Sequence, residues 1–148
     1  MEIPVEFPVD ADGFLRRMCQ SCGQEFKWHN GPTELRPPDA ADPLMFACPL
    51  CGSRASPEDW QTEGQGTYLR EVGEFHMQDV VNGEMKKVFG KNYRPGKNTA
   101  SAPTALHEPN DMIIIEPPCH PWEPVKVPEE RADSGPMFCL VCGESYSA

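Results

Sequence analysis

The chain lacks any long apolar run, since no segment approaches the roughly 20 apolar residues of a membrane span. Its first residues, MEIPVEFPVDADGF, do not combine a basic start with an apolar stretch, so they do not read as an export signal. Basic residues are also scarce: 13 Lys and Arg face 23 Asp and Glu, which gives a net charge of −10. We therefore expect a cytoplasmic protein that is a poor general binder of polyanions.

Long uninterrupted secondary structure is also missing. The 148 residues include 17 prolines and 12 glycines, and both residue types interrupt helices and strands. Modules of about 40–60 residues bury too little surface to be stable alone and usually need a metal or disulfides. The chain does have seven cysteines. In a reducing compartment, C-x-x-C pairs bind metal or do redox chemistry more often than they form structural disulfides.

Six of the cysteines form three C-x-x-C pairs, each followed by glycine: CQSCG at 19–23, CPLCG at 48–52 and CLVCG at 139–143. Structural zinc usually takes four tetrahedral ligands, and thiolates are its common choice. The trailing glycine accepts the left-handed conformation that lets backbone N–H groups point at the sulfurs. The first two turns therefore predict one complete zinc site, with the ligands Cys19, Cys22, Cys48 and Cys51.

A second site lacks one cysteine. Cys119, Cys139 and Cys142 can supply three thiolates, but Trp122 stands where C-x-x-C spacing would place the fourth. An open three-ligand zinc could in principle be catalytic. The chain has no H-E-x-x-H motif and no deaminase signature, so we do not expect an enzyme.

His120 is the nearest candidate for the fourth ligand, because neutral imidazole binds zinc well. Neighbouring side chains diverge in an extended chain, so Pro121 must bend this segment to bring the side chains of both Cys119 and His120 to the metal. His107, His76, a water molecule and an empty site remain alternatives. We expect Trp122 to pack over the turn, with an interface role as the alternative.

The two ends of the chain look like copies of one unit. CQSCGQEFKWH…PLMFACPLCGS near the N-terminus parallels CHPWEPVKVP…GPMFCLVCGE at the C-terminus. Lys27 follows Cys22 by five residues, and Lys126 follows Trp122 by four, each among strand-forming residues. We interpret this as a duplication.

Paired cysteine turns on strand-like flanks resemble the zinc-ribbon and rubredoxin-like families, over about residues 14–54 and 113–147. Through DGFLRRMC, EFKWH and CHPWEPVKV, the chain also resembles small, largely uncharacterised bacterial proteins with a double zinc ribbon. The resemblance implies two Zn²⁺ ions and no particular activity. The alternative is a rubredoxin-like iron centre for electron transfer, although the loop between the turns lacks that family's glycine- and aromatic-rich run.

We thus predict a small metal-stabilised α+β fold, with two zinc-ribbon β-hairpin modules joined by a helix and a flexible linker. Strands are expected at 13–18, 24–29, 43–47 and 112–116. A helix is expected to begin near Ser56, with Pro57 at its first position, and apolar spacings of three and four predict another over 67–89. The predicted segments are an N-terminal ribbon at 1–60, a helical segment at 61–95, a linker at 96–111 and a C-terminal ribbon at 112–148.

The middle of the chain carries a basic cluster, interleaved with aromatic residues: Lys86, Lys87, Lys91, Arg94 and Lys97. Such a cluster can bind nucleic-acid phosphates, but lysines near a helix C-terminus also complement the helix dipole. We expect a non-enzymatic zinc-binding adaptor for protein–protein interaction, with an unidentified partner or through self-association. A nucleic-acid-associated regulator is the alternative.

Overall fold

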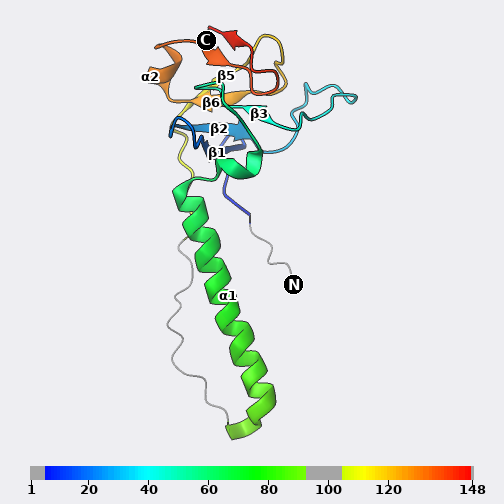
Figure 1. Ribbon diagram of the computed structural model, residues 1–148, viewed down its shortest axis with the longest axis vertical. Coiled ribbons are helices and arrows are strands. Elements are labelled where there is room, and N and C mark those ends of the chain that lie inside the picture. The colour runs from blue at the N-terminus through cyan, green and yellow to red at the C-terminus, as the bar shows by residue number, and fades with distance from the viewer. Residues whose placement is uncertain (1–5, 93–104, 148) are drawn as a thin grey trace. The chain divides into compact units, whose positions relative to one another are not determined.

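The computed structural model describes residues 6–92 and 105–147. Their contacts define two compact units: Pro8–Thr62 with His107–Ala148 forms one, and the other contains the long helix α1 (Glu63–Phe89). Antiparallel hairpins and one long helix make this a small α+β protein (Figure 1). Among the described residues, no helix is both long enough and apolar enough to cross a bilayer.

Four short antiparallel strands form the central sheet, in the order β1-β2-β6-β5. Their bounds are Phe14–Met18 for β1, Glu25–His29 for β2, Ile113–Ile115 for β5 and Val125–Val127 for β6. The central pairing, β2 with β6, places Lys27 directly opposite Lys126. These are the two lysines that the internal duplication makes equivalent, so the two copies meet at equivalent positions.

A second contact between the copies has the same symmetry. Ala47 N–H donates to the Leu140 carbonyl at 2.8 Å, and Phe138 N–H donates to the Pro49 carbonyl at 2.9 Å. Ala47 and Phe138 each precede the first cysteine of their turn, while Pro49 and Leu140 each follow it. Exchanging the copies therefore maps this pair of hydrogen bonds onto itself, which indicates an approximate two-fold relation.

Six further short elements contain or adjoin the strands on either side of the second cysteine turn of each copy. They are β3 (Phe46–Ala47), β4 (Arg54–Ala55), the 3₁₀ helix η1 (Pro57–Trp60), α2 (Glu129–Ala132), β7 (Met137–Phe138) and β8 (Ser145–Tyr146). β3 pairs with β4, and β7 pairs with β8. The helix expected near Ser56 is thus a single 3₁₀ turn, with Pro57 as its first residue.

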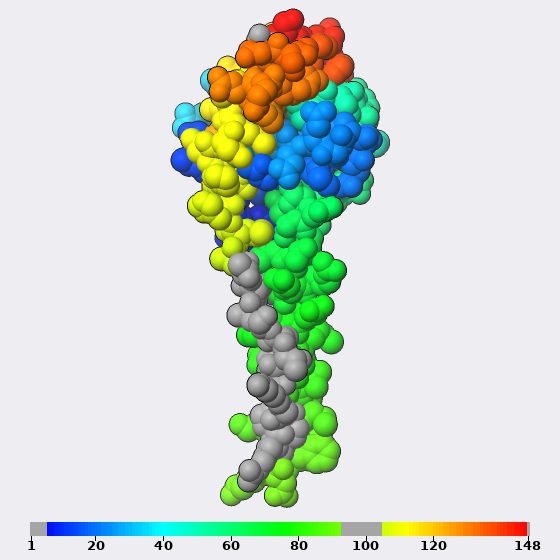
Figure 2. Space-filling model, turned by 90° about the vertical axis from the view of Figure 1, so that its left-hand side faces the viewer, coloured from blue at the N-terminus to red at the C-terminus, as the bar shows by residue number. Residues whose placement is uncertain are grey.

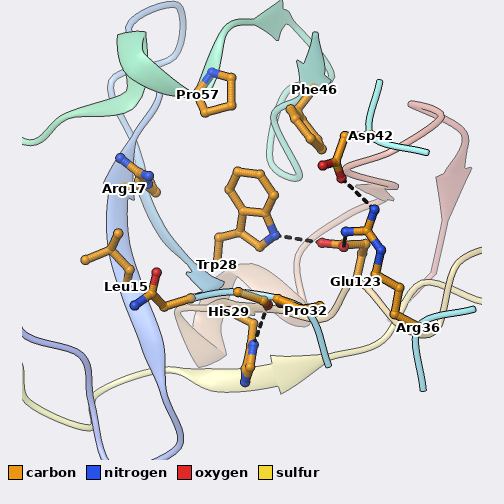
Figure 3. A pocket seen from close by; sticks show the side chains of 12 residues that line it. Leu15, Arg17, Trp28, His29, Pro32, Arg36, Asp42, Phe46, Pro57 and Glu123 are labelled. Carbon is orange, nitrogen blue, oxygen red and sulfur yellow. Dashed lines mark hydrogen bonds and ion pairs between the residues drawn. The ribbon is translucent and has the colours of Figure 1, made fainter. Parts of the chain in front are cut away.

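Successive side chains along each strand point to opposite sides, so the sheet has two different faces. Lys27 is paired with Arg16 on one side and with Lys126 on the other, so these three cations share one face. Trp28 is paired with Leu15, and both project from the opposite face together with Arg17 (Figure 3).

The main apolar core lies on that second face. Phe26, Val125 and Val127 are at most 1% exposed and cluster with Met137 and Trp60, which are fully buried. The Trp60 ring packs edge-on against Phe26, with centroids 5.2 Å apart. Each such side chain stabilises the fold by about 1.5–3 kcal/mol through burial, so η1 is held in place by its last residue.

The helix α1 begins at Glu63, four residues before the predicted start, and ends at Phe89 as predicted. Gly90 follows with φ 61°, a left-handed conformation that terminates helices. Lys86 and Lys87 lie in the last turn, where they complement the helix dipole.

Most of the apolar side chains of α1 form two groups. At 100° per residue, the groups lie on about opposite sides of the helix. The first contains Tyr68, Leu69, Val72 and Phe75, and the second contains Met77, Val81, Met85 and Val88. All four members of the second group are exposed, Met77 by 62% and Val88 by 72%.

Candidate metal centres

The three C-x-x-C turns adopt one backbone conformation. In each, the first cysteine's N–H donates to the carbonyl five residues later, and the trailing glycine's N–H donates back to that cysteine's carbonyl. The six distances lie between 2.7 and 3.0 Å. The glycines Gly23, Gly52 and Gly143 have φ of 71°, 80° and 74°, which other residues rarely adopt. This local geometry holds both cysteines of a turn on the same side.

The first cluster brings together the four predicted thiols, whose sulfurs all lie within 4.8 Å of one another. Cys19 Sγ is 3.7 Å from Cys51 Sγ, and Cys22 Sγ is 4.0 Å from Cys48 Sγ. Zinc–sulfur bonds near 2.3 Å at tetrahedral angles require sulfurs about 3.8 Å apart. The spacing therefore fits one tetrahedral ion, and Leu50 N–H also donates to Cys48 Sγ at 3.4 Å.

The second cluster consists of three thiols and one imidazole, again within 4.8 Å of one another. Cys119 Sγ is 3.5 Å from Cys142 Sγ, and His120 Nδ1 is 3.4 Å from Cys139 Sγ. A tetrahedral zinc would place a nitrogen and a sulfur about 3.5 Å apart. Among the described residues, His120 is the histidine in this cluster, and neither His107 nor His76 belongs to it.

The chain around His120 is curved rather than extended. His120 N–H donates to the Pro117 carbonyl at 3.2 Å, and Glu123 N–H donates to the His120 carbonyl at 3.0 Å. Two successive turns thus bring adjacent side chains to one point, which an extended chain could not do. The Trp122 ring packs edge-on against His120, with centroids 5.1 Å apart, and this confirms the expected packing over the turn.

Burial and crowding raise the pKa of several thiols, whereas hydrogen bonds lower the pKa of Cys51. Burial, together with the nearby Cys139 and Cys142, raises the pKa of Cys119 to about 12, and burial also raises the pKa of Cys48. Burial acts in the same direction on Cys51, but hydrogen bonds from Ser53 outweigh it and hold the pKa of that thiol at about 7. A bound metal must therefore displace protons from most of these sulfurs.

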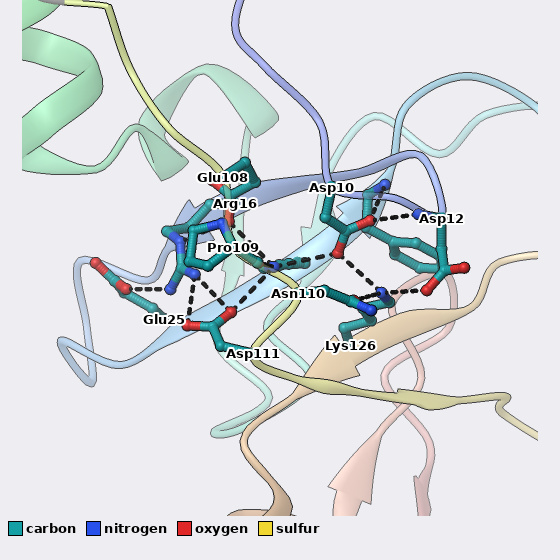
Figure 4. A network of polar contacts seen from close by, with 11 residues as sticks. Asp10, Asp12, Arg16, Glu25, Glu108, Pro109, Asn110, Asp111 and Lys126 are labelled. Carbon is teal, nitrogen blue, oxygen red and sulfur yellow. Dashed lines mark hydrogen bonds and ion pairs between the residues drawn. The ribbon is translucent and has the colours of Figure 1, made fainter.

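The opposite face of the sheet carries a buried ionic network that the sequence did not predict (Figure 4). Both Lys27 and Lys126 are at most 1% exposed, and their ammonium groups share Asp10 Oδ2 at 3.1 and 2.8 Å. Lys126 also contacts Asp12 at 2.7 Å, and Lys27 also contacts Asp111 at 3.0 Å. The only hint in the sequence is the pair of matching patterns, F-K-W and V-K-V, which place a lysine between two apolar residues.

This network joins segments that are far apart in the chain. Arg16 donates to Glu108 at 3.0 Å and to Asp111 at 2.7 Å, so residues 107–111, the end of the predicted linker, lie against the β1–β2 hairpin (Figure 2). Burial opposes ionisation of Asp10, but hydrogen bonds from Lys126, the Phe14 N–H and Lys27 lower its pKa to about 2. The carboxylate is therefore ionised at neutral pH.

The predicted basic cluster is described only in part. Lys86 and Lys87 are exposed at the end of α1, and Lys91 follows in the 3₁₀ helix η2 (Gly90–Asn92). Lys87 pairs with Glu84 at 3.3 Å. Arg94 and Lys97 lie outside the described residues.

Comparisons of the chain with protein-family models, with curated proteins and with solved structures give no match. The assignment of the two clusters therefore depends on their own geometry: four thiols in one and three thiols with an imidazole in the other, each compatible with a metal ion.

Proposed function

We propose that the protein is a non-enzymatic zinc-binding adaptor, in which two Zn²⁺ ions hold the hairpins together and the surface serves protein–protein interaction. The tetrahedral spacing of the two four-ligand clusters carries the zinc assignment. Four protein ligands fill the coordination shell of zinc, a property of structural rather than catalytic sites.

The shortness of the strands supports a structural role for the metal. β3, β4, β7 and β8 have two residues each, and pairs of this length are not stable alone. Structural zinc binds with about 10–16 kcal/mol, comparable to the whole stability of a typical domain. Two such ions would therefore decide whether these hairpins fold.

The proposed role in protein–protein interaction rests on the second apolar group of α1. Met77, Val81, Met85 and Val88 are exposed on one side of the helix, and contiguous exposed apolar side chains commonly mark interaction surfaces. The occupant would be a protein partner or a second copy of this chain.

Metal analysis of purified protein tests the zinc assignment. We expect two zinc ions per chain and a colourless solution, because Zn²⁺ has a filled d shell. A red preparation with stoichiometric iron that bleaches on reduction would instead establish an electron-transfer centre.

The surface on α1 is tested by Val88→Glu, with Lys86→Gln as a control that makes the net charge more negative by the same one unit on the other side of the helix. We expect the first change to abolish self-association in sedimentation experiments and the second to preserve it. A wild-type monomer would exclude a second copy as the occupant.

A further inference from the structure

A cavity of about 370 Å³ lies beside Trp28, in the unit that contains the central sheet (Figure 3). None of its lining residues belongs to either metal cluster. Its volume is within the range of small-molecule sites, near the lower end.

The cavity has a rigid aromatic wall. The Trp28 ring packs against Phe46, with centroids 4.6 Å apart, and Leu15 lies opposite Trp28 on the neighbouring strand. The indole N–H of Trp28 donates to Glu123 Oε2 at 2.8 Å, which fixes the ring orientation. A planar apolar group can therefore pack here without rearranging the wall.

The charges at one end of this wall are already paired. Arg36 contacts Asp42 at 2.9 Å and Glu123 at 3.7 Å. Glu123 uses its second oxygen for Trp28, so both acids are occupied by groups of the protein. A cationic ligand would have to displace these contacts.

Arg17, which also lines the cavity, is different. Its Nε is buried and has no hydrogen-bond partner among the described residues, and no carboxylate there forms an ion pair with it. Burial without a partner also lowers the pKa of this guanidinium. Buried polar groups are nearly always satisfied, so the unpaired Nε of a cation that lines an open cavity points to a missing anion.

We propose that this cavity binds a small planar carboxylate, whose ring packs against Trp28 while its carboxylate pairs with Arg17. The guanidinium fork matches a carboxylate in shape and charge, and the volume accommodates about one or two rings. The site is independent of the zinc assignment, so its failure would leave the proposed function intact.

The test uses the full-length protein with its native metal content and two probes of the same shape, 2-naphthoate and the neutral 2-naphthamide. NMR titration follows the indole N–H of Trp28 and the Nε–H of Arg17. We expect saturable shifts of both signals with naphthoate and a dissociation constant about tenfold or more below that for the amide. Arg17→Gln should remove this preference, while Arg70→Gln, which removes one positive charge on α1, should preserve it.

Equal affinities of the two probes for the wild type would overturn the proposal, because the carboxylate would then gain nothing from Arg17. Shifts that spread over the surface without saturating at Trp28 would also overturn it. The comparison of the two probes in the wild type decides the matter even where Arg17→Gln does not fold.

Discussion

The imidazole of His120 is the ligand that distinguishes the two candidate metal centres, and His120→Ala removes it. In this structure its Nδ1 is 3.4 Å from Cys139 Sγ, and the three remaining thiols stay in place. His120 is only half-buried, so a water molecule can occupy the vacated position.

The size of the effect follows from sharing the binding energy among the ligands. Structural zinc binds with about 10–16 kcal/mol, or about 2.5–4 kcal/mol for each of four ligands. A loss of about 3 kcal/mol corresponds to about a hundredfold weaker binding at this centre. The thiolate centre formed by Cys19, Cys22, Cys48 and Cys51 should keep its affinity.

Competition with a graded series of chelators measures this change as zinc per chain. We expect two zinc ions in the wild type and in the control His107→Ala, and one at intermediate chelator strength in His120→Ala. Limited proteolysis should then cut His120→Ala within residues 117–147, because metal binding supplies folding energy for a segment this small. Two tightly bound zinc ions in His120→Ala would refute the assignment, and one zinc in the wild type would mean that the second centre is empty.

Three further predictions concern the ionic network, the basic helix end and the accessibility of the second centre. Asp10→Asn should lower the free energy of unfolding by about 3 kcal/mol, the lower end for a broken buried pair because each lysine keeps another carboxylate. Asp12→Asn, at a 48% exposed side chain, should cost at most about 1 kcal/mol in the same urea titration at saturating zinc, and equal losses would contradict this. Because the pKa of Asp10 is lowered from 3.8 to about 2, its carboxylate adds to the free energy of unfolding above pH 4, and this contribution is lost as the pH falls towards 2. The corresponding loss of stability should be missing when Asp10→Asn is titrated with acid. Duplex DNA should bind the protein weakly at physiological salt. Tight binding that depends less on salt in the double variant Lys86→Gln/Lys87→Gln than in the wild type would favour the nucleic-acid alternative. Cys119 is exposed, so a chelator should remove zinc from the second centre first, and simultaneous loss from both would exclude this order.

The sequence alone determined the features that depend on neighbouring residues. A C-x-x-C pair followed by glycine builds the same turn at three places, because its hydrogen bonds close within five residues. The strands beside the first turn and most of α1 follow from local propensity and the period of apolar residues, so they were predictable to within a few positions. The duplication was visible for the same reason, as repeated local patterns.

Only the tertiary structure decided how these parts meet. Lys27 and Lys126 are 99 positions apart, and nothing local indicates that they share one carboxylate inside the protein. His120 completes the second cluster only because two turns curve the chain and because β7 and β8 bring Cys139 and Cys142 to it. The unpaired Arg17 likewise becomes visible only after folding, because a missing partner can be recognised only when every neighbour of the side chain is known.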